Sequence, residues 1–228
     1  LKRRWKKFKT LKRGYYSLDI LAVLYTLSFL LPLLINNRAL IVKYDGALHF
    51  PIFSGYISGK EFGQDVPGEA KYRKLKDQFA GQMGSDNWVL MPPYPYSPYE
   101  DITTEGNKMY EPPSRKHWLG TDNTGRDVFA RLCYAFNISI SFALTLTLIN
   151  YVIGVLIGGA MGYFGGKFDL IFQRLIEVWS SLPMLFVIII LSSILKPSFL
   201  LLIGIYTLVN WISTVSYTHL RAHETLLY

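Results

Sequence analysis

The stretch LCYAFNISISFALTLTLINYVIGVLIGGAMGYFGG, Leu132 to Gly166, decides the fold, because its 35 residues include no charged side chain. A helix of this composition is uncharged on every face, which is unusual in the core of a soluble protein and typical of a helix surrounded by lipid. Within it, Ile138–Met161 is long enough to cross a bilayer. The sequence therefore predicts a membrane helix here, in preference to a buried core helix.

Three other stretches share this character. Leu18–Ile35 carries one charge, Asp19, and as a helix it would cover ~27 Å of hydrocarbon. Val178–Leu195 is a third candidate, and Phe199 to about Ile212 is a fourth, weaker one. The sequence predicts an all-α polytopic membrane protein with about four transmembrane helices.

The net charge of +8 comes from one end of the chain. The first 13 residues contain eight Lys or Arg and no acid, and the rest of the chain has 16 residues of each sign. A basic arm of this kind suits nucleic acid, but this one ends five residues before an apolar span. By the positive-inside rule, residues 1–17 form a cytoplasmic arm, and no nucleic-acid partner is expected. Residues 36–137 then lie on the far side, the periplasm of a bacterium, as an α/β or irregular insertion that includes the helix-entry residues.

The polar block KHWLGTDNTGRDVFARL, residues 116–132, comes directly before the uncharged run. His117 beside Trp118 is the one acid–base candidate, but no nucleophile motif, Walker lysine or metal-ligand spacing accompanies it. We therefore expect no enzyme, no cofactor and no metal. The block predicts a turn and a helix start at the outer membrane surface, capped by one of the residues 121–123. Its hypothesised local ion pairs join Asp122 to Arg126 or Arg131.

Gly154, Gly158 and Gly162 recur every four residues inside the second span. On a helix they form one smooth stripe, which lets another backbone approach closely. The stripe predicts a helix bundle and an interface with another subunit. Pro183 predicts a kink in the third span, and the amphipathic segment KFDLIFQRLIEVW, residues 167–179, predicts a helix along the cytoplasmic surface.

Two motifs in this order resemble the inner-membrane permease subunit of dipeptide/oligopeptide-type ABC importers. The family pattern L-G-T-D-x-x-G-R-D-x-x-x-R is matched by Leu119, Gly120, Thr121, Asp122, Gly125, Arg126, Asp127 and Arg131. The pattern G-Y-x-G-G-x-x-D is matched by Gly162, Tyr163, Gly165, Gly166 and Asp169, with Lys167 in the same cytoplasmic turn. The segments LIVKYDGALHFPIF and DNWVLMPPYPY resemble the branch associated with microcin C and oligopeptide uptake, which has a long periplasmic insertion.

The resemblance implies a multi-pass protein of the bacterial inner membrane that serves ATP-driven peptide uptake. It would form the translocation path with a homologous second permease subunit. Two cytoplasmic ATPase subunits would supply the energy, and a periplasmic peptide-binding protein would deliver the peptide. The alternatives are a secondary transporter and a membrane-anchored periplasmic protein. A secondary transporter is expected to place ionisable groups or broken helices at mid-membrane, and the spans carry no charge there.

The C-terminal segment departs from the family pattern. Members continue into a coupling loop and two further helices, for six in all, whereas this chain reads VSYTHLRAHETLLY. His219 and His223 with Glu224 resemble half a zinc site, but the order H-E-x-x-H is absent. The string resembles translated sequencing-adapter DNA. We expect a permease core over residues 138–214 and a non-native tail over residues 215–228.

Overall fold

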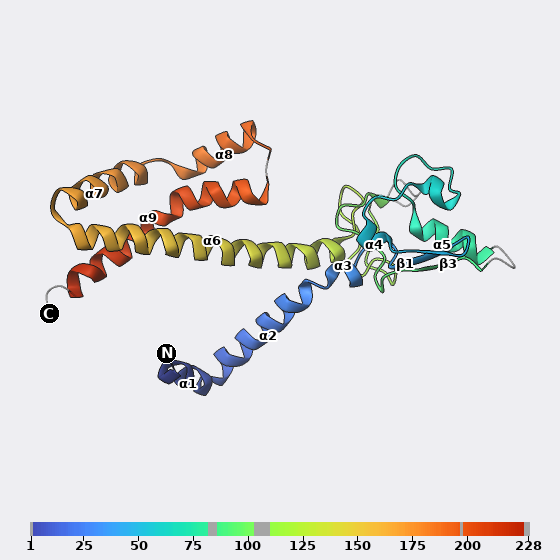
Figure 1. Ribbon diagram of the computed structural model, residues 1–228, viewed down its shortest axis with the longest axis horizontal. Coiled ribbons are helices and arrows are strands. Elements are labelled where there is room, and N and C mark those ends of the chain that lie inside the picture. Colours follow the sequence, from blue (N-terminus) through green and yellow to red (C-terminus); the bar gives the residue numbers. More distant parts are fainter. Residues whose placement is uncertain (1, 82–85, 103–109, 197, 226–228) are drawn as a thin grey trace. The chain divides into compact units, whose positions relative to one another are not determined.

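A computed structural model describes residues 2–81, 86–102, 110–196 and 198–225 of the chain, with the backbone alone from residue 217 onward (Figure 1). It divides into two compact units, Leu1–Ile138 and Ser139–Tyr228. Each is described by itself.

The first unit opens with the helices α1 (Lys2–Thr10), α2 (Lys12–Ser28) and α3 (Leu31–Leu34). The single helix expected over residues 18–35 is wrong at both ends. The helix starts earlier, at Lys12, and it ends at Ser28. Pro32 explains the break, since its ring clashes with the carbonyl four residues back and it has no N–H to donate. Backbone hydrogen bonds continue past the end of α2, because the N–H groups of Phe29 and Leu30 donate to the carbonyls of Thr26 and Leu27.

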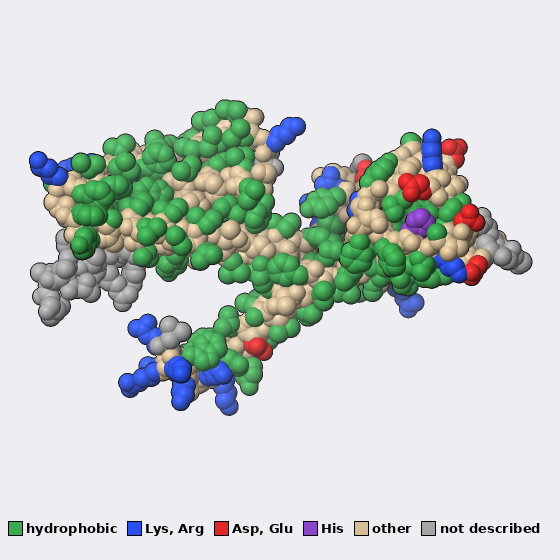
Figure 2. Space-filling model, viewed as in Figure 1, with side chains coloured by type: hydrophobic (Ala, Val, Ile, Leu, Met, Phe, Trp, Pro, Cys, Tyr) green, Lys and Arg blue, Asp and Glu red, His purple; other side chains and the backbone are tan. Residues whose placement is uncertain are grey.

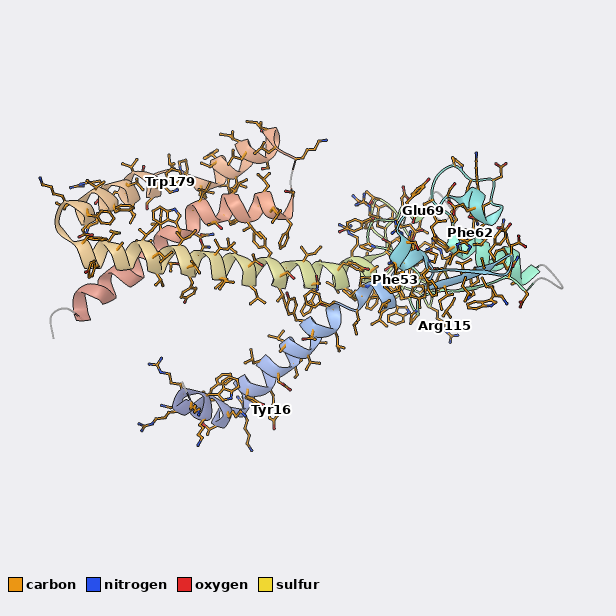
Figure 3. The ribbon with its side chains drawn as sticks, in the orientation of Figure 1. Tyr16, Phe53, Phe62, Glu69, Arg115 and Trp179 are labelled. Atoms are coloured by element: carbon orange, nitrogen blue, oxygen red, sulfur yellow. The ribbon has the colours of Figure 1, made fainter. Side chains whose placement is uncertain are left out.

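A small α/β subdomain follows. Its three antiparallel strands, in the order β2-β1-β3, are β1 (Ile41–Tyr44), β2 (Ala47–His49) and β3 (Trp88–Leu90). Its helices are α4 (Pro51–Ser54), the 3-10 helix η1 (Gly59–Phe62) and α5 (Tyr72–Gly81). Val42 and Val89 on the sheet pack with Phe62, Leu75 and Phe79 in one buried core (Figure 3 labels Phe62). The subdomain has the short strands that the sequence suggests, together with helices.

The uncharged stretch forms α6 (Val128–Phe164), which begins in the first unit and continues through the second. The second unit adds α7 (Gly166–Ser180), α8 (Met184–Ile194) and α9 (Phe199–Thr225). In the described part of the chain, two helical segments are long and apolar enough to cross a membrane, Val128–Phe164 and Phe199–Ser216. The bent pair α7 and α8 makes a third if it counts as one span. The structure thus supports two or three spans, whereas the sequence analysis expects about four.

Two further boundaries differ from the sequence-based ones. The second span begins as a helix at Val128, ten residues before Ile138, because the preceding residue caps it there. The third, expected as one helix over residues 178–195, is split, and α7 and α8 meet at a bend of 72°. Pro183 lies at the N-terminus of α8, where its ring and missing N–H prevent the helix from continuing.

Large apolar side chains cover the outside of the helices (Figure 2). Leu144, Leu148, Val152 and Leu156 recur every four residues along α6, and each is more than half exposed. A soluble protein does not leave such a continuous apolar ridge in water, whereas lipid is its natural surrounding. The chain is a membrane protein.

Candidate functional site

The eight family-matched residues are organised around a tight turn at Asp122. They are here called the helix-start motif and are Leu119, Gly120, Thr121, Asp122, Gly125, Arg126, Asp127 and Arg131. One carboxylate oxygen, Oδ1, accepts hydrogen bonds from the N–H of Thr124, the hydroxyl of Thr124 and the N–H of Arg126, at 2.9, 2.8 and 2.9 Å. The backbone closes the same turn, because the Asp122 N–H donates to the Arg126 carbonyl. A side chain that satisfies several backbone donors fixes a turn without help from the rest of the fold.

The other oxygen of Asp122 forms an ion pair with the guanidinium of Arg131 on the first turns of α6. Of the two partners that the sequence leaves open, Arg131 makes the side-chain pair, and Arg126 contributes backbone groups. Burial alone would raise the pKa of Asp122. The hydrogen bonds from the Arg126 N–H and from Thr124, together with the Arg131 guanidinium, outweigh this effect and lower the pKa to about 2. Asp122 is therefore ionised at any physiological pH.

Two glycines of the motif occupy positions that other residues do not tolerate. Gly120 and Gly125 have φ angles of 71° and 68°, in the left-handed region. A Cβ on Gly120 would also lie 2.4 Å from the carbonyl oxygen of Glu111. Next to it, the Thr121 N–H donates to that carbonyl at 3.0 Å, and the Thr121 hydroxyl accepts from the Glu111 N–H at 2.8 Å. These contacts join the motif to the segment before it.

Asp127 is fully buried and accepts three hydrogen bonds. Its Oδ1 accepts from the N–H of Ala130 at 2.8 Å, which makes Asp127 the cap of α6. Its Oδ2 lies 2.7 Å from the donating hydroxyl of Tyr94 and 2.8 Å from Nδ1 of His117. The cap expected among residues 121–123 is wrong, because those residues form the turn and the helix starts only after it.

His117 is also fully buried, so it is a structural residue and not an exposed acid–base group. Its ring lies 4.4 Å from the Tyr96 ring, and its Nε2, which has no hydrogen-bond partner, lies 3.6 Å from a carboxylate oxygen of Glu111. Both ring nitrogens thus face carboxylates. The contacts of the ring with these carboxylates hold the surrounding loop in place.

Sequence reasoning missed the tyrosines as members of this cluster. Tyr94 packs edge-on against Trp118 and Phe129, at 5.1 Å from each ring, besides its bond to Asp127. Burial, followed by that hydrogen bond, raises the pKa of Tyr94 well above its ordinary value. Tyr96 lies under the guanidinium of Arg73 at 4.8 Å. The alternating Pro and Tyr in residues 91–100 was the available signal, but nothing in it indicates a partner 33 residues away.

The glycine stripe meets another helix of the same chain. A Cβ on Gly154 would lie 2.4 Å from Cγ2 of Thr214 and 3.2 Å from its backbone carbonyl carbon, so α6 and α9 approach closely there. Gly158 and Gly162 are buried on the same face. Farther along, the indole N–H of Trp179 on α7 donates to the carbonyl of Leu208 on α9 at 2.8 Å (Figure 3).

The turn between α6 and α7 contains the second matched motif. Gly165 and Gly166 both have positive φ angles, 57° and 53°, which reverses the chain between the two helices. Lys167 is exposed, and Asp169 lies in the first turn of α7, where its Oδ2 accepts from Gln173 at 3.0 Å. An acid in this place also complements the helix dipole.

A cavity of about 430 Å³ lies beside α3, among residues that include Asn36, Tyr99 and Tyr134. Arg38 and Glu69 in its wall form an ion pair at 2.6 Å, and Glu100 of the wall pairs at 2.7 Å with Arg73, which is not a lining residue. Because each charged residue of the wall has a partner of opposite sign, the cavity favours no ligand of one sign.

No group of three or more His, Cys, Asp or Glu side chains is placed to hold a metal in the described parts of the chain. The side chains of His219, His223 and Glu224 lie outside the described residues.

Residues 154–226 match the family described as "Binding-protein-dependent transport system inner membrane component". This match runs past residue 214, where the sequence analysis places the end of the native sequence. The chain is 44% identical to the inner membrane ABC transporter permease protein YejE of Escherichia coli over 93% of its own length and 61% of that protein's. It is 34% identical to the peptidoglycan transport system permease protein YejE of Agrobacterium fabrum, over 94% and 61%.

A third relative is the dipeptide transport system permease protein DppC of Bacillus subtilis, 42% identical over 52% of this chain and 36% of DppC. The chain thus spans about three fifths of the length of the two YejE proteins. The long matches to these two extend well beyond the segment that the family profile covers.

Proposed function

We propose that this chain, which is similar to inner-membrane ABC transporter permease proteins, is the permease subunit of an ATP-driven peptide uptake system. A short peptide or a peptide-containing compound is its cargo. The observation that carries the proposal is the similarity to permeases over more than nine tenths of the chain. That family is a class of transport protein and not a class of enzyme.

The helix-start motif has a positional role in this proposal. Its hydrogen bonds and its ion pair fix the point at which α6 begins, and α6 is the longest apolar helix among the described elements. The motif holds this helix at the outer surface of the membrane. The subdomain of residues 36–127 then lies in the periplasm, and the basic arm of residues 1–17 lies in the cytoplasm.

We propose three kinds of protein partner. A homologous second permease completes the translocation path, two cytoplasmic ATPase subunits drive it, and a periplasmic peptide-binding protein delivers the cargo. Because the glycine stripe packs against α9 at Gly154, other faces of the helices contact the second permease. Residues 165–169 face the cytoplasm. We also propose that residues 215–228 form a non-native tail.

The uncharged apolar segments, which exclude the charged helix α7, favour this reading over a secondary transporter. Residues 132–166, α8 and residues 199–216 contain no Asp, Glu, Lys or Arg, whereas ion-coupled transporters use ionisable groups at membrane depth. The energy for transport must then come from outside this chain. ATP hydrolysis by partner subunits is the corresponding source.

The test is uptake in cells from which the full gene has been deleted. A radiolabelled tripeptide is supplied, and the gene is returned as the wild type or as the Asp127→Ala variant. We expect uptake to disappear on deletion and to return with the wild type only. Vanadate, which blocks ABC ATPases, should abolish it. Uptake that survives deletion, or that is vanadate-resistant and abolished by an uncoupler, contradicts the proposal.

A further inference from the structure

The basic arm is the most strongly charged part of the described surface. Its Lys and Arg side chains surround α1 and the start of α2 (Figure 2). They are Lys2, Arg3, Arg4, Lys6, Lys7, Lys9, Lys12 and Arg13. All eight are exposed, and none of them takes part in the ion pairs among the described residues. The arm therefore presents uncompensated positive charge.

An aromatic cluster gives this arm a fixed geometry. Trp5 stacks on Phe8 at 5.6 Å, and both rings meet Tyr15 edge-on, at 6.5 and 6.4 Å. The ammonium of Lys9 lies 5.8 Å from the Trp5 ring and 5.7 Å from the Tyr15 ring. The helix is interrupted at Leu11, whose ψ of 73° is not helical. The cluster thus holds α1 against the first turn of α2 instead of in line with it.

The apolar residues that follow show how deep the arm lies. Leu18, Ile20, Leu21, Val23 and Leu24 of α2 are each about half exposed around the helix, which suits surrounding lipid. Tyr15 and Tyr16 stand immediately before them, and the Tyr16 side chain is 59% exposed (Figure 3). Tyr and Trp rings prefer the headgroup region of a bilayer. The rings therefore place the basic side chains at headgroup depth.

We propose that residues 2–16 form a binding surface for anionic phospholipid headgroups of the leaflet in which α2 begins. Clusters of four to eight Lys or Arg beside a membrane helix attract anionic lipid electrostatically. The ring faces add apolar contact at the same depth, and they keep the charged helix along the surface. Nucleic acid shares the charge preference, but α1 is tied by its rings to α2, whose exposed apolar side chains suit lipid, so it meets the phosphates of the bilayer first.

The test uses the full-length protein in nanodiscs, either of neutral phosphatidylcholine or with a third of the lipid replaced by phosphatidylglycerol. Chymotrypsin cuts after Trp5, Phe8, Tyr15 and Tyr16, and mass spectrometry of the N-terminal fragments gives the cleavage rate. At low salt we expect cleavage in this segment to be about tenfold slower in anionic discs, because the bound arm is shielded. The difference should vanish at high salt.

Matched variants separate this effect from general charge. Substituting Lys2, Lys6 and Lys7 by Gln keeps every chymotrypsin site and should remove the protection. Substituting the exposed Lys60, Lys74 and Lys76 by Gln removes the same charge elsewhere and should leave the protection intact. Equal cleavage in both discs, or protection that survives the arm substitutions, overturns the proposal. Protection in neutral discs on adding RNA or inorganic phosphate, without any in anionic discs, also overturns it.

Discussion

Except for Arg131, the helix-start motif immediately precedes α6, the glycine stripe lies on α6, and the two fix this helix by opposite means. In the motif, Asp127 accepts three hydrogen bonds, and Asp122 accepts three at Oδ1 besides its ion pair with Arg131 at Oδ2. In the stripe, Gly154 contributes only the absence of a side chain, which leaves room for Thr214. Outside the hydrocarbon a buried polar network specifies position, whereas inside it close van der Waals packing does so.

Removal of the Asp127 side chain should break the polar half of this comparison most severely. Asp127→Ala leaves the buried His117 and Tyr94 without their acceptor and α6 without its cap. We expect a loss of about 3 kcal/mol, read as a lower melting temperature and as faster hydrogen exchange at the Ala130 amide. Asp127→Asn is the control, because its amide oxygen keeps the cap and its loss should be smaller. An alanine variant as stable as the wild type contradicts the network.

Filling the stripe should break the packing half. Gly154→Ala places a Cβ 2.4 Å from Thr214, so the helices must separate, at a cost of about 1–3 kcal/mol. Gly159→Ala is the matched control on the same helix, because its Cβ meets nothing within 4 Å. Melting temperatures of the isolated chain in one detergent compare the two. If Gly154→Ala is harmful only when the second permease is present, the stripe serves that interface, as the sequence suggests.

The Asp122 turn sharpens the comparison on the polar side. Asp122→Ala should cost about 1 kcal/mol, because the loop loses a capping-type acceptor, while Asp122→Asn keeps that acceptor and should cost less. Since folding lowers the Asp122 pKa to about 2, its contribution is complete above the ordinary pKa of a carboxyl and is lost as the pH falls towards 2. Hydrogen exchange at the Arg126 amide should therefore be unaffected by this group between pH 5 and 8. Strong acceleration already at pH 5 would refute the assignment.

Exchanging the charges of Asp122 and Arg131 is a weak test of their ion pair. An arginine at position 122 cannot accept the three hydrogen bonds that Oδ1 receives, so the swap should fail to restore function even though the ion pair is real.

The smallest effect is expected at Arg131 itself. Its side chain is 48% exposed, and half-exposed ion pairs contribute little, so Arg131→Gln should change stability by no more than about 1 kcal/mol. The melting temperature of this variant should stay close to that of the wild type. A loss as large as that of Asp127→Ala would mean that the ion pair, and not the buried network, holds the helix start.

Local sequence patterns predicted part of this structure, because they depend on neighbours. The uncharged run predicts α6, and the cluster of Gly, Asp and Thr predicts a turn before it. Pro183 predicts a kink in the third span, and Pro32 accounts in the same way for the end of α2 at Ser28. The choice between Arg126 and Arg131 needed coordinates, because both side chains are within reach along the chain.

Long-range contacts lay beyond the sequence. His117 looks like an acid–base candidate when only Trp118 and the acids nearby are considered. In the fold it is a buried structural residue, because it contacts the Tyr96 ring, which lies far earlier in the chain, and the Asp127 carboxylate, which follows the Asp122 turn. The packing of Gly154 on Thr214 joins residues 60 positions apart. The spacing of the glycines alone predicts that another backbone approaches α6, but it does not identify the helix to which that backbone belongs.

The most direct test of the central proposal is peptide uptake into proteoliposomes that contain the complex purified through a tag on the full-length form of this chain. We predict that ATPase subunits co-purify and that a labelled tripeptide, presented with its binding protein, accumulates only when ATP is supplied on the ATPase side. An imposed proton or sodium gradient without ATP should drive none. Accumulation driven by such a gradient in the absence of ATP would contradict the account.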